Sequence, residues 1–187
     1  MKKLFEKYVD WRILAHFLRN PTTRFYIKEL SRKLGISPRS ALEAAKAFWS
    51  EGILTKEEIG QAHMYKLNNE LPVVKALKKT YILTLLHDHK VVWRFCSSDE
   101  DMISLVLYGS YSSGEYDEKS DLDLLVVTPA KKEAYDALMR ELEKALNIPI
   151  SLEALTLTDW KKLSKTNNPF YLDVARNHTV LHGSGIE

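Results

Sequence analysis

The sequence has little cysteine, glycine and proline, and it has no long apolar run. Its single cysteine, Cys96, excludes an internal disulfide and fits a reducing compartment. The 7 glycines and 6 prolines among 187 residues form no flexible linker or low-complexity tract. No apolar stretch is long enough to cross a membrane, and the opening residues MKKLFEKYVDWR lack the apolar core of a signal peptide. These absences favour a cytoplasmic protein without a membrane partner.

Charge is unevenly distributed along the chain, although the formal net charge is only +2. Residues 1–68 contain 13 Lys and Arg against 7 Asp and Glu, which gives a formal charge of +6. Residues 69–187 contain 14 against 18, which gives −4. A basic half joined to an acidic half indicates two modules with different partners.

Three helical patterns and two strand patterns follow one another in the basic half. Apolar residues recur every three or four positions from Leu4 to Leu18, which predicts a first helix. A second, shorter helix is expected to end at Gly35, and the Ser-Pro pair at 37–38 provides a cap and a first-turn proline for a third. Two β-prone runs around a turn near Gly60 predict a hairpin.

This order of elements resembles the winged helix-turn-helix family over roughly the first third of the chain. The resemblance implies that the third helix enters the major groove of duplex DNA and that the hairpin contacts the DNA backbone. Arg39 is expected on the outward side of that helix, where it would contact guanine or phosphate. The alternative is a module for dimerisation or protein contacts, because the outward side carries just two cations and one anion. The residues expected to contact DNA are Arg39, Ser40, Lys46, Lys56 and His63.

The next segment, residues 69–97, has the apolar periodicity of a helix that connects the two modules. It contains His87 and His89, whose spacing of two positions places them on different faces of a helix. Solvent-exposed histidines are therefore expected here rather than a pair of metal ligands.

The stretch LYGSYSSGEYDEKSDLDLLVV, residues 107–127, joins two apolar strand patterns through a small polar loop. The period of a strand places Asp121 and Asp123 on one face. Two neighbouring carboxylates repel each other unless a cation lies between them, and such hard oxygen ligands suit Mg²⁺, with Mn²⁺ as the alternative. Gly109 allows a phosphate to approach the backbone, Ser110 adds a hydroxyl, and the N–H groups of a short helix at 110–114 would bind an anion. Adjacent metal and phosphate sites are the requirement for transfer from a nucleoside triphosphate.

The same stretch resembles the signature of the DNA polymerase beta superfamily of nucleotidyltransferases, and especially the minimal nucleotidyltransferases of prokaryotes. The resemblance rests on Gly-Ser, a following glycine and Asp-x-Asp on the next strand, and it extends over about residues 98–183. Ser113 departs from the pattern, since many members have arginine there. By this resemblance Asp121 and Asp123 are catalytic metal ligands. The residues implied in nucleotide binding are Gly109, Ser110, Gly114 and Ser120.

A helix is expected at residues 131–147, and the family pattern also implies a third carboxylate on the strand that follows it. Glu153 is the only acid in the strand pattern ISLEAL, so it is the candidate for a shared metal ligand and catalytic residue. A solvated surface glutamate is the other interpretation, and Asp159 or Asp173 would then be the residues to consider.

The sequence therefore predicts an α+β protein with a winged helix-turn-helix domain at 1–68, a connecting helix at 69–97 and a nucleotidyltransferase domain with a mixed sheet at 98–187. The expected reaction is Mg²⁺-dependent transfer of a nucleoside monophosphate, with ATP as the expected donor, to a hydroxyl acceptor. One alternative is a nucleotide-sensing DNA-binding regulator with a vestigial transferase domain. Another is an antitoxin-like enzyme whose acceptor is a partner protein. A dimer is compatible with either module.

Overall fold

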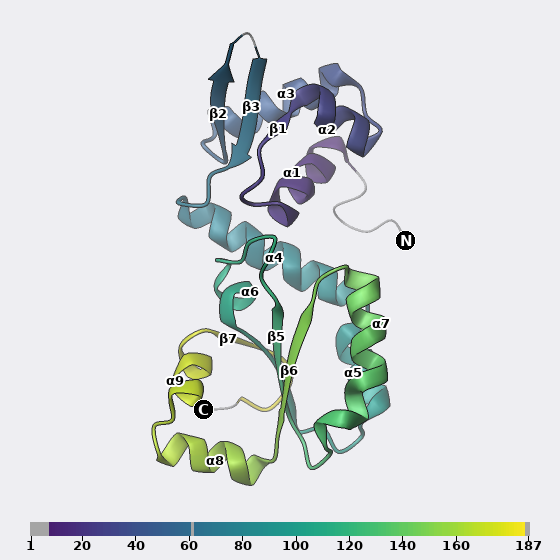
Figure 1. The fold of residues 1–187 in the computed structure, drawn as a ribbon, viewed down its shortest axis with the longest axis vertical. Coiled ribbons are helices and arrows are strands. Elements are labelled where there is room, and N and C mark those ends of the chain that lie inside the picture. Colours follow the sequence, from purple (N-terminus) through teal and green to yellow (C-terminus); the bar gives the residue numbers. More distant parts are fainter. Residues whose placement is uncertain (1–7, 61, 186–187) are drawn as a thin grey trace. The chain divides into compact units, whose positions relative to one another are not determined.

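The computed structural model describes residues 8–60 and 62–185, and it divides the chain into two compact units (Figure 1). The first unit contains the chain up to Tyr81 together with the segment Tyr116–Lys119. The second contains Ile82–Glu115 and the chain from Ser120 onward. The division falls inside helix α4 (Pro72–Asp88). Leu4, expected on the first helix, lies outside the described residues.

The first unit has the predicted order of three helices followed by a hairpin. Its small sheet is antiparallel, with strand order β1-β3-β2. The architecture confirms the expected elements, whereas the identification as a winged DNA-binding module stays a prediction. The elements are α1 (Val9–Arg19), β1 (Phe25–Tyr26), α2 (Ile27–Leu34), α3 (Pro38–Ser50), β2 (Leu54–Ile59) and β3 (Ala62–Leu67).

Local signals fix the ends of these helices as the sequence predicts. Gly35 ends α2 in the left-handed conformation, with φ of 59°. Ser37 caps α3, because its Oγ accepts a hydrogen bond of 3.0 Å from the backbone N–H of Ser40. The core beneath them includes the edge-to-face pair Phe17 and Phe25, whose ring centroids are 5.6 Å apart.

The second unit is built on a mixed sheet with strand order β6-β5-β4-β7. β5 and β6 are parallel, and the other two pairs are antiparallel, which confirms the predicted mixed sheet. The strands are β4 (Ser104–Tyr108), β5 (Leu122–Val127), β6 (Ile150–Leu155) and β7 (His178–Gly183). The helices are the end of α4, α5 (Val91–Ser98), α6 (Gly109–Ser113), α7 (Asp136–Leu146), α8 (Leu157–Lys165) and α9 (Pro169–Arg176).

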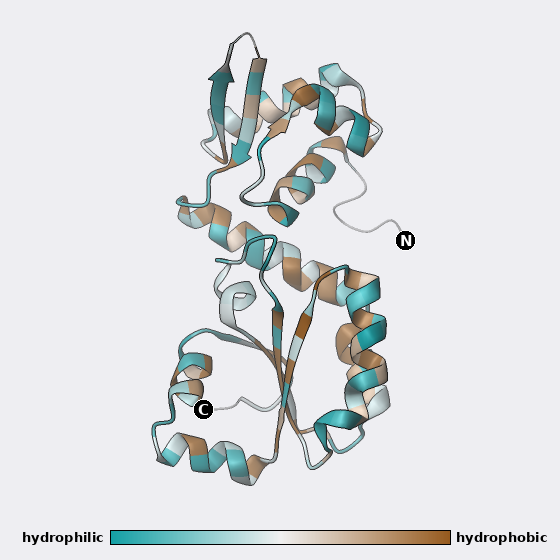
Figure 2. Cartoon of the chain, viewed as in Figure 1, coloured by the Kyte–Doolittle hydropathy of each residue, from teal (hydrophilic) through white to brown (hydrophobic). Residues whose placement is uncertain are grey.

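Helices cover both faces of this sheet (Figure 1). Trp160 of α8 and Val174 of α9 pack on one face, against Val106, Tyr108 and Leu125. The opposite side carries α5 and α7, which contribute Phe95, Leu138 and Leu142 to the core. Strands that lie between these helices, such as β5 and β6, contain hydrophobic stretches, which are brown in Figure 2.

Three details differ from the sequence-based expectations. The connecting segment forms two helices, because Lys90 adopts a left-handed conformation with φ of 54° between α4 and α5. The predicted helix at 131–147 begins as a 3-10 turn at Lys132–Tyr135 before α7 starts. β5 begins at Leu122, so Asp121 immediately precedes the strand instead of lying within it. Among the described residues, no helix combines the length and the apolar character needed to cross a membrane.

Candidate active site

Gly109 and Asp123 form the closest contact of the site. β4 passes directly into α6 at Gly109, whose φ of 67° is a conformation that residues with a side chain rarely adopt. A Cβ atom on Gly109 would lie within 3.0 Å of Asp123 Oδ2, closer than real Cβ atoms approach. Glycine is therefore favoured by the backbone, a side chain here would displace the Asp123 carboxylate, and the start of α6 lies against the carboxylate of β5.

Asp123 carries a half-buried carboxylate in an acidic environment. Burial raises its pKa, and the charges of Asp121 and Asp173 raise it further. Asp121 is exposed, one residue before β5 begins. The two aspartates of the motif are thus close enough to repel each other, even though only Asp123 belongs to the strand.

Tyr108, at the end of β4, interacts electrostatically with three carboxylates. Burial raises its pKa to about 12, and the charges of Asp123, Glu153 and Asp173 act in the same direction, against a hydrogen bond with Ser151. The hydroxyl therefore stays protonated and remains a hydrogen-bond donor or acceptor near neutral pH. Tyr108 is buried, and its ring packs edge-to-face on Phe170 at 5.7 Å.

The register of the parallel strands locates Glu153 relative to the motif. Asp123 pairs with Ser151, and Glu153 pairs with Leu125, one step further along the same face of the sheet. Lys132 Nζ lies 3.4 Å from Glu153 Oε1 in a partly exposed ion pair. A serine, and not an acid, is therefore the direct neighbour of Asp123 on β6, and the catalytic assignment of Glu153 stays a prediction.

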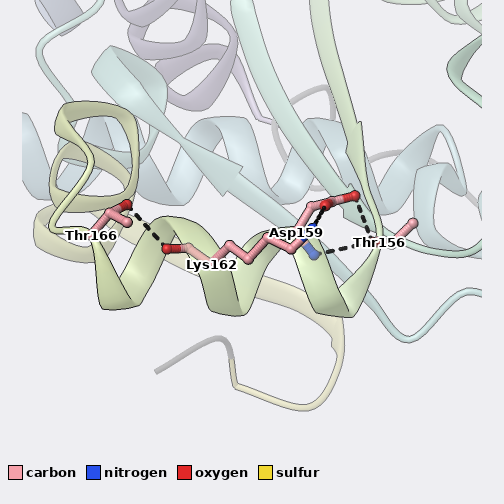
Figure 3. Close-up of polar contacts among 4 residues, drawn as sticks. All are labelled: Thr156, Asp159, Lys162 and Thr166. Atoms are coloured by element: carbon pink, nitrogen blue, oxygen red, sulfur yellow. Dashed lines mark hydrogen bonds and ion pairs between the residues drawn. The ribbon is translucent and has the colours of Figure 1, made fainter.

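Of the two substitutes for Glu153, Asp159 has another role. Thr156 caps α8 by accepting the backbone N–H of Asp159 at 3.1 Å, and its hydroxyl donates to Asp159 Oδ2 at 2.7 Å (Figure 3). Lys162 Nζ also contacts Asp159, at 3.2 Å. These local contacts engage Asp159 in the first turn of α8.

Asp173 was the less prominent acid in the sequence, yet it acts electrostatically on both Asp123 and Tyr108. The signal that identifies it is the spacing of α9, where Phe170 and Val174 are the apolar residues that pack on the sheet. Asp173 precedes Val174 directly and so lies beside that packed side. The sequence also offers a signal for Tyr108, which lies two positions after Val106 on β4, the strand that leads into Gly109.

The other expected nucleotide-binding residues lie on α6, at its end, or just before β5 in the sequence. The carbonyl of Ser110 accepts the backbone N–H of Glu115 at 2.9 Å, which closes α6 after one turn. Gly114 ends the helix with φ of 80°. Ser120 is half-buried and immediately precedes Asp121. The fold thus brings Gly109, at the start of α6, against Asp123 of β5, and the contact of Gly109, Ser110, Gly114 and Ser120 with a nucleotide stays a prediction.

The residues present suit a divalent cation that takes part of its coordination from a nucleotide. Carboxylate oxygens are hard ligands, and Mg²⁺ usually binds one or two of them together with phosphate oxygens and water. Asp121 and Asp123 supply such a pair, and their mutual repulsion would be relieved by a cation. Within the part of the chain that the structure describes, no group of three or more His, Cys, Asp or Glu is arranged to hold a metal ion.

Three of the residues expected to contact DNA have acidic neighbours in the first unit. Arg39 Nε donates to Glu43 Oε1 at 2.9 Å. Lys56 Nζ lies 2.9 Å and His63 Nδ1 3.5 Å from the same carboxylate, Glu58 Oε1. The charges of Arg39 and Lys56 are thus partly neutralised, which lowers the positive charge that DNA phosphates would meet.

The remaining two differ in exposure and role. Ser40 takes part in the cap of α3, with its Oγ 2.9 Å from Ser37 Oγ. Lys46 is exposed on α3. Arg39 and His63 line one hollow of the first unit together with Lys28, Arg32 and the acid Glu29.

A family model described as "Nucleotidyltransferase domain" matches residues 89–179. The matched range includes β4, α6, β5, β6 and α9, and therefore every element that contributes to the candidate active site. The prediction of a nucleotidyltransferase domain in this part of the chain, and of an enzyme, is confirmed by this match.

Two solved structures also resemble the chain. One, described as a toxin-antitoxin with AMP-PNP, is 22% identical, with a TM-score of 0.34 over 57% of this chain and 73% of that chain. The other, described as a mutant of the toxin-antitoxin MntA-HpeT, is 20% identical, with a TM-score of 0.36 over the same shares. Both TM-scores are below 0.5. The search of curated proteins found no match.

Proposed function

From a nucleotidyltransferase domain at residues 89–179, we propose that the protein transfers a nucleoside monophosphate from a nucleoside triphosphate, with ATP as the expected donor, to a hydroxyl acceptor. The acceptor oxygen forms a bond to the α-phosphorus, and the bond from that phosphorus to the bridging oxygen of pyrophosphate breaks. The hydroxyl proton passes to a carboxylate, and pyrophosphate leaves with the electron pair of the broken bond.

The observation that carries this proposal is the approach of Gly109 to the carboxylate of Asp123. It joins the two halves of the sequence motif, which are separated by 13 residues along the chain, into one site. A small residue beside a carboxylate leaves room for phosphate oxygens next to a metal ligand. This combination supports nucleotide binding more directly than either half alone.

Asp121 and Asp123 would hold Mg²⁺, which when bound would neutralise part of the triphosphate charge. Ser110 and Gly114 would border the phosphates at α6. Tyr108 is protonated at neutral pH and buried, so its contribution is to shape the floor of the site and to support Ser151.

The proton acceptor is one of the acids on the same side of the sheet. Glu153 of β6 and Asp173 of α9 both act electrostatically on Tyr108, and Asp173 also acts on Asp123. Glu153 Oε1 also lies 3.4 Å from Lys132 Nζ. An ionised carboxylate is the state that can accept a proton from the acceptor hydroxyl.

DNA binding by the first unit is a second proposal, and it belongs to the alternative of a nucleotide-sensing regulator. The hollow lined by Lys28, Arg32 and Arg39 favours it, because three cations against the one acid Glu29 attract phosphates. The pairing of Arg39 and His63 with glutamates weighs against it. The antitoxin-like alternative differs only in the acceptor, which would be a partner protein.

The test is incubation with each nucleoside triphosphate labelled at the α-phosphate, with Mg²⁺, in the presence and absence of a cell lysate. Wild-type protein is expected to produce a labelled product, and Asp123→Asn is expected to produce none. Asp101→Asn, which changes an exposed acid of the turn before β4, is the matched control and should retain activity. Label on protein would favour the antitoxin-like reaction, whereas nucleotide binding without any product would favour the sensor.

A further inference from the structure

The segment Tyr116–Lys119 connects the two halves of the candidate active site, yet it belongs to the first unit. Glu115 precedes it and is tied to α6 by a hydrogen bond of 2.9 Å to the carbonyl of Ser110. Asp121 follows it after one intervening residue. The chain therefore leaves the second unit after the phosphate-binding turn and returns to it at the metal-binding aspartates.

Glu118 is held by two adjacent threonines of the first unit. The hydroxyls of Thr22 and Thr23 donate to its carboxylate at 2.6 and 2.8 Å, and their backbone N–H groups donate at 2.9 Å each. Although burial opposes the shift, these hydrogen bonds lower the pKa of Glu118. A carboxylate that accepts four hydrogen bonds is fixed in place far better than an ordinary surface glutamate.

Tyr116 is held by a buried lysine. Lys78 of α4 is only 2% exposed, and its Nζ donates to the carbonyl of Tyr116 at 2.6 Å and to Asn69 Oδ1 at 3.2 Å. The same ammonium lies 4.5 Å from the centre of the Tyr116 ring. The Tyr116 hydroxyl donates in turn to the carbonyl of Leu18 at 2.9 Å. A buried ammonium needs such partners, so Lys78 and Tyr116 stabilise each other's position.

These contacts limit where Asp121 can lie. Leu122 is fixed in the sheet of the second unit by a hydrogen bond of 2.8 Å from its N–H to the carbonyl of Pro149. Glu118 and Leu122 are four residues apart, a distance that an extended chain spans in at most about 14 Å. Asp121 lies within this short segment between Glu118 and Leu122, whereas Asp123 is part of β5 itself.

We propose that the first unit positions Asp121 for nucleotide binding by holding the segment Tyr116–Lys119, which makes Lys78 and Glu118 positioning residues of the transferase reaction. The inference rests on the proposed function of the second unit. A ligand that binds the first unit and changes the contacts of this segment would therefore change the affinity of the second unit for nucleotide. Because such coupling is reciprocal, the nucleotide would change the affinity for that ligand by the same factor.

The test compares two variants with two matched controls. Glu118→Gln keeps the shape of the side chain and removes the charge, and Lys78→Met keeps its length and removes the donor. Lys79→Met changes the next lysine of α4, which is only partly buried, and Glu70→Gln changes an exposed glutamate of the first unit. Because Lys78→Met removes a buried cation and risks unfolding, Glu118→Gln at an exposed position keeps the proposal testable.

Amide hydrogen exchange and Mg²⁺–ATP affinity are the two readouts, measured on the full chain. Exchange of residues 119–121 should rise roughly tenfold in both variants, while exchange of β4 stays at the wild-type rate. The dissociation constant for Mg²⁺–ATP should rise by roughly 5- to 20-fold, with the controls unchanged. A purely structural role would lower the melting temperature without changing that constant.

Two results would overturn the proposal: unchanged exchange of residues 119–121 in folded Glu118→Gln, or raised exchange with wild-type nucleotide affinity. If the wild-type chain binds no nucleotide, the proposed transferase function is wrong. The exchange comparison then still decides whether the first unit orders the segment, and wild-type exchange in both variants would show that it does not.

Discussion

Substitution of Gly109 tests the close contact with Asp123 together with the strain of its backbone conformation. Gly109→Ala introduces a Cβ atom against Asp123 Oδ2 at a φ of 67°, so both effects act together. We expect the free energy of unfolding to fall by about 1–3 kcal/mol, measured by urea denaturation, and nucleotide binding to be lost.

Gly35→Ala is the matched control for this prediction. Gly35 has a similar φ of 59° and open space around it, so only the strain applies. Its loss of stability should be the smaller of the two, and Mg²⁺–ATP affinity should stay at the wild-type value. Wild-type affinity in Gly109→Ala would contradict the assigned contact.

Asp123 makes metal-dependent binding sensitive to pH. Its pKa is raised above the ordinary value of 3.8, so the carboxyl takes up a proton at a higher pH than an exposed aspartate does. Protonation competes with metal, and the affinity for Mg²⁺–ATP should therefore fall as the pH is lowered through this raised pKa. Titration calorimetry at a series of pH values measures the fall.

The stability of the metal-free protein should change in the opposite direction. The folded state holds this proton more tightly than the unfolded state, so the stabilisation from Asp123 is complete below the unfolded pKa and is lost as the pH rises through the folded pKa. Asp123→Asn should remove this contribution. An identical pH dependence in wild type and variant would show that Asp123 is not the titrating group.

Two elements compete to supply the third carboxylate, β6 through Glu153 and α9 through Asp173. If β6 supplies it, Glu153→Gln should leave Mg²⁺–ATP affinity near wild type and lower the single-turnover rate by roughly two or more orders of magnitude. Asp173→Asn should then have a much smaller effect on that rate.

The reverse result would assign the role to α9. Loss of both binding and rate in Glu153→Gln would indicate misfolding, which circular dichroism detects. Wild-type rates in both variants would exclude both elements and direct attention to a residue from another chain.

At the level of the elements, local sequence patterns predicted the ends of helices and the turns better than they predicted which residues pair between strands. The Ser-Pro pair before α3, Gly35, Gly60 and Gly114 each determine backbone geometry within a few residues, so the structure confirms them. The break at Lys90 has no glycine or proline to mark it. The neighbour of Asp123 on β6 depends on parallel pairing across 28 residues of sequence, which no local pattern specifies.

The contribution of α9 to the site was equally hard to predict, since it depends on how two distant segments pack. The motif from Gly109 to Asp123 could be predicted because both halves lie in one strand-helix-strand unit. Asp173 comes from a helix about 50 residues later and is brought near only by the packing of Val174 and Phe170 on the sheet.

For the whole molecule, the function of the basic half can be tested separately from catalysis. Arg39→Ala combined with Lys46→Ala should weaken binding to duplex DNA and make its dependence on salt less steep, because each lost phosphate contact lowers counterion release. Fluorescence anisotropy over a series of salt concentrations measures both quantities. Absence of duplex binding by the wild-type chain, even at low salt, would assign the first unit to protein contacts instead.

The central claim is that the second unit breaks the bond between the α-phosphate and the bridging oxygen of pyrophosphate. The most direct measurement uses ATP labelled at the α-phosphate in one reaction and at the γ-phosphate in another, with Mg²⁺ and acceptor. We predict that the α-label appears in the product and the γ-label in pyrophosphate, in equal amounts, and that Asp123→Asn forms neither. Transfer of the γ-label to the acceptor, or its release as free phosphate, would contradict the account.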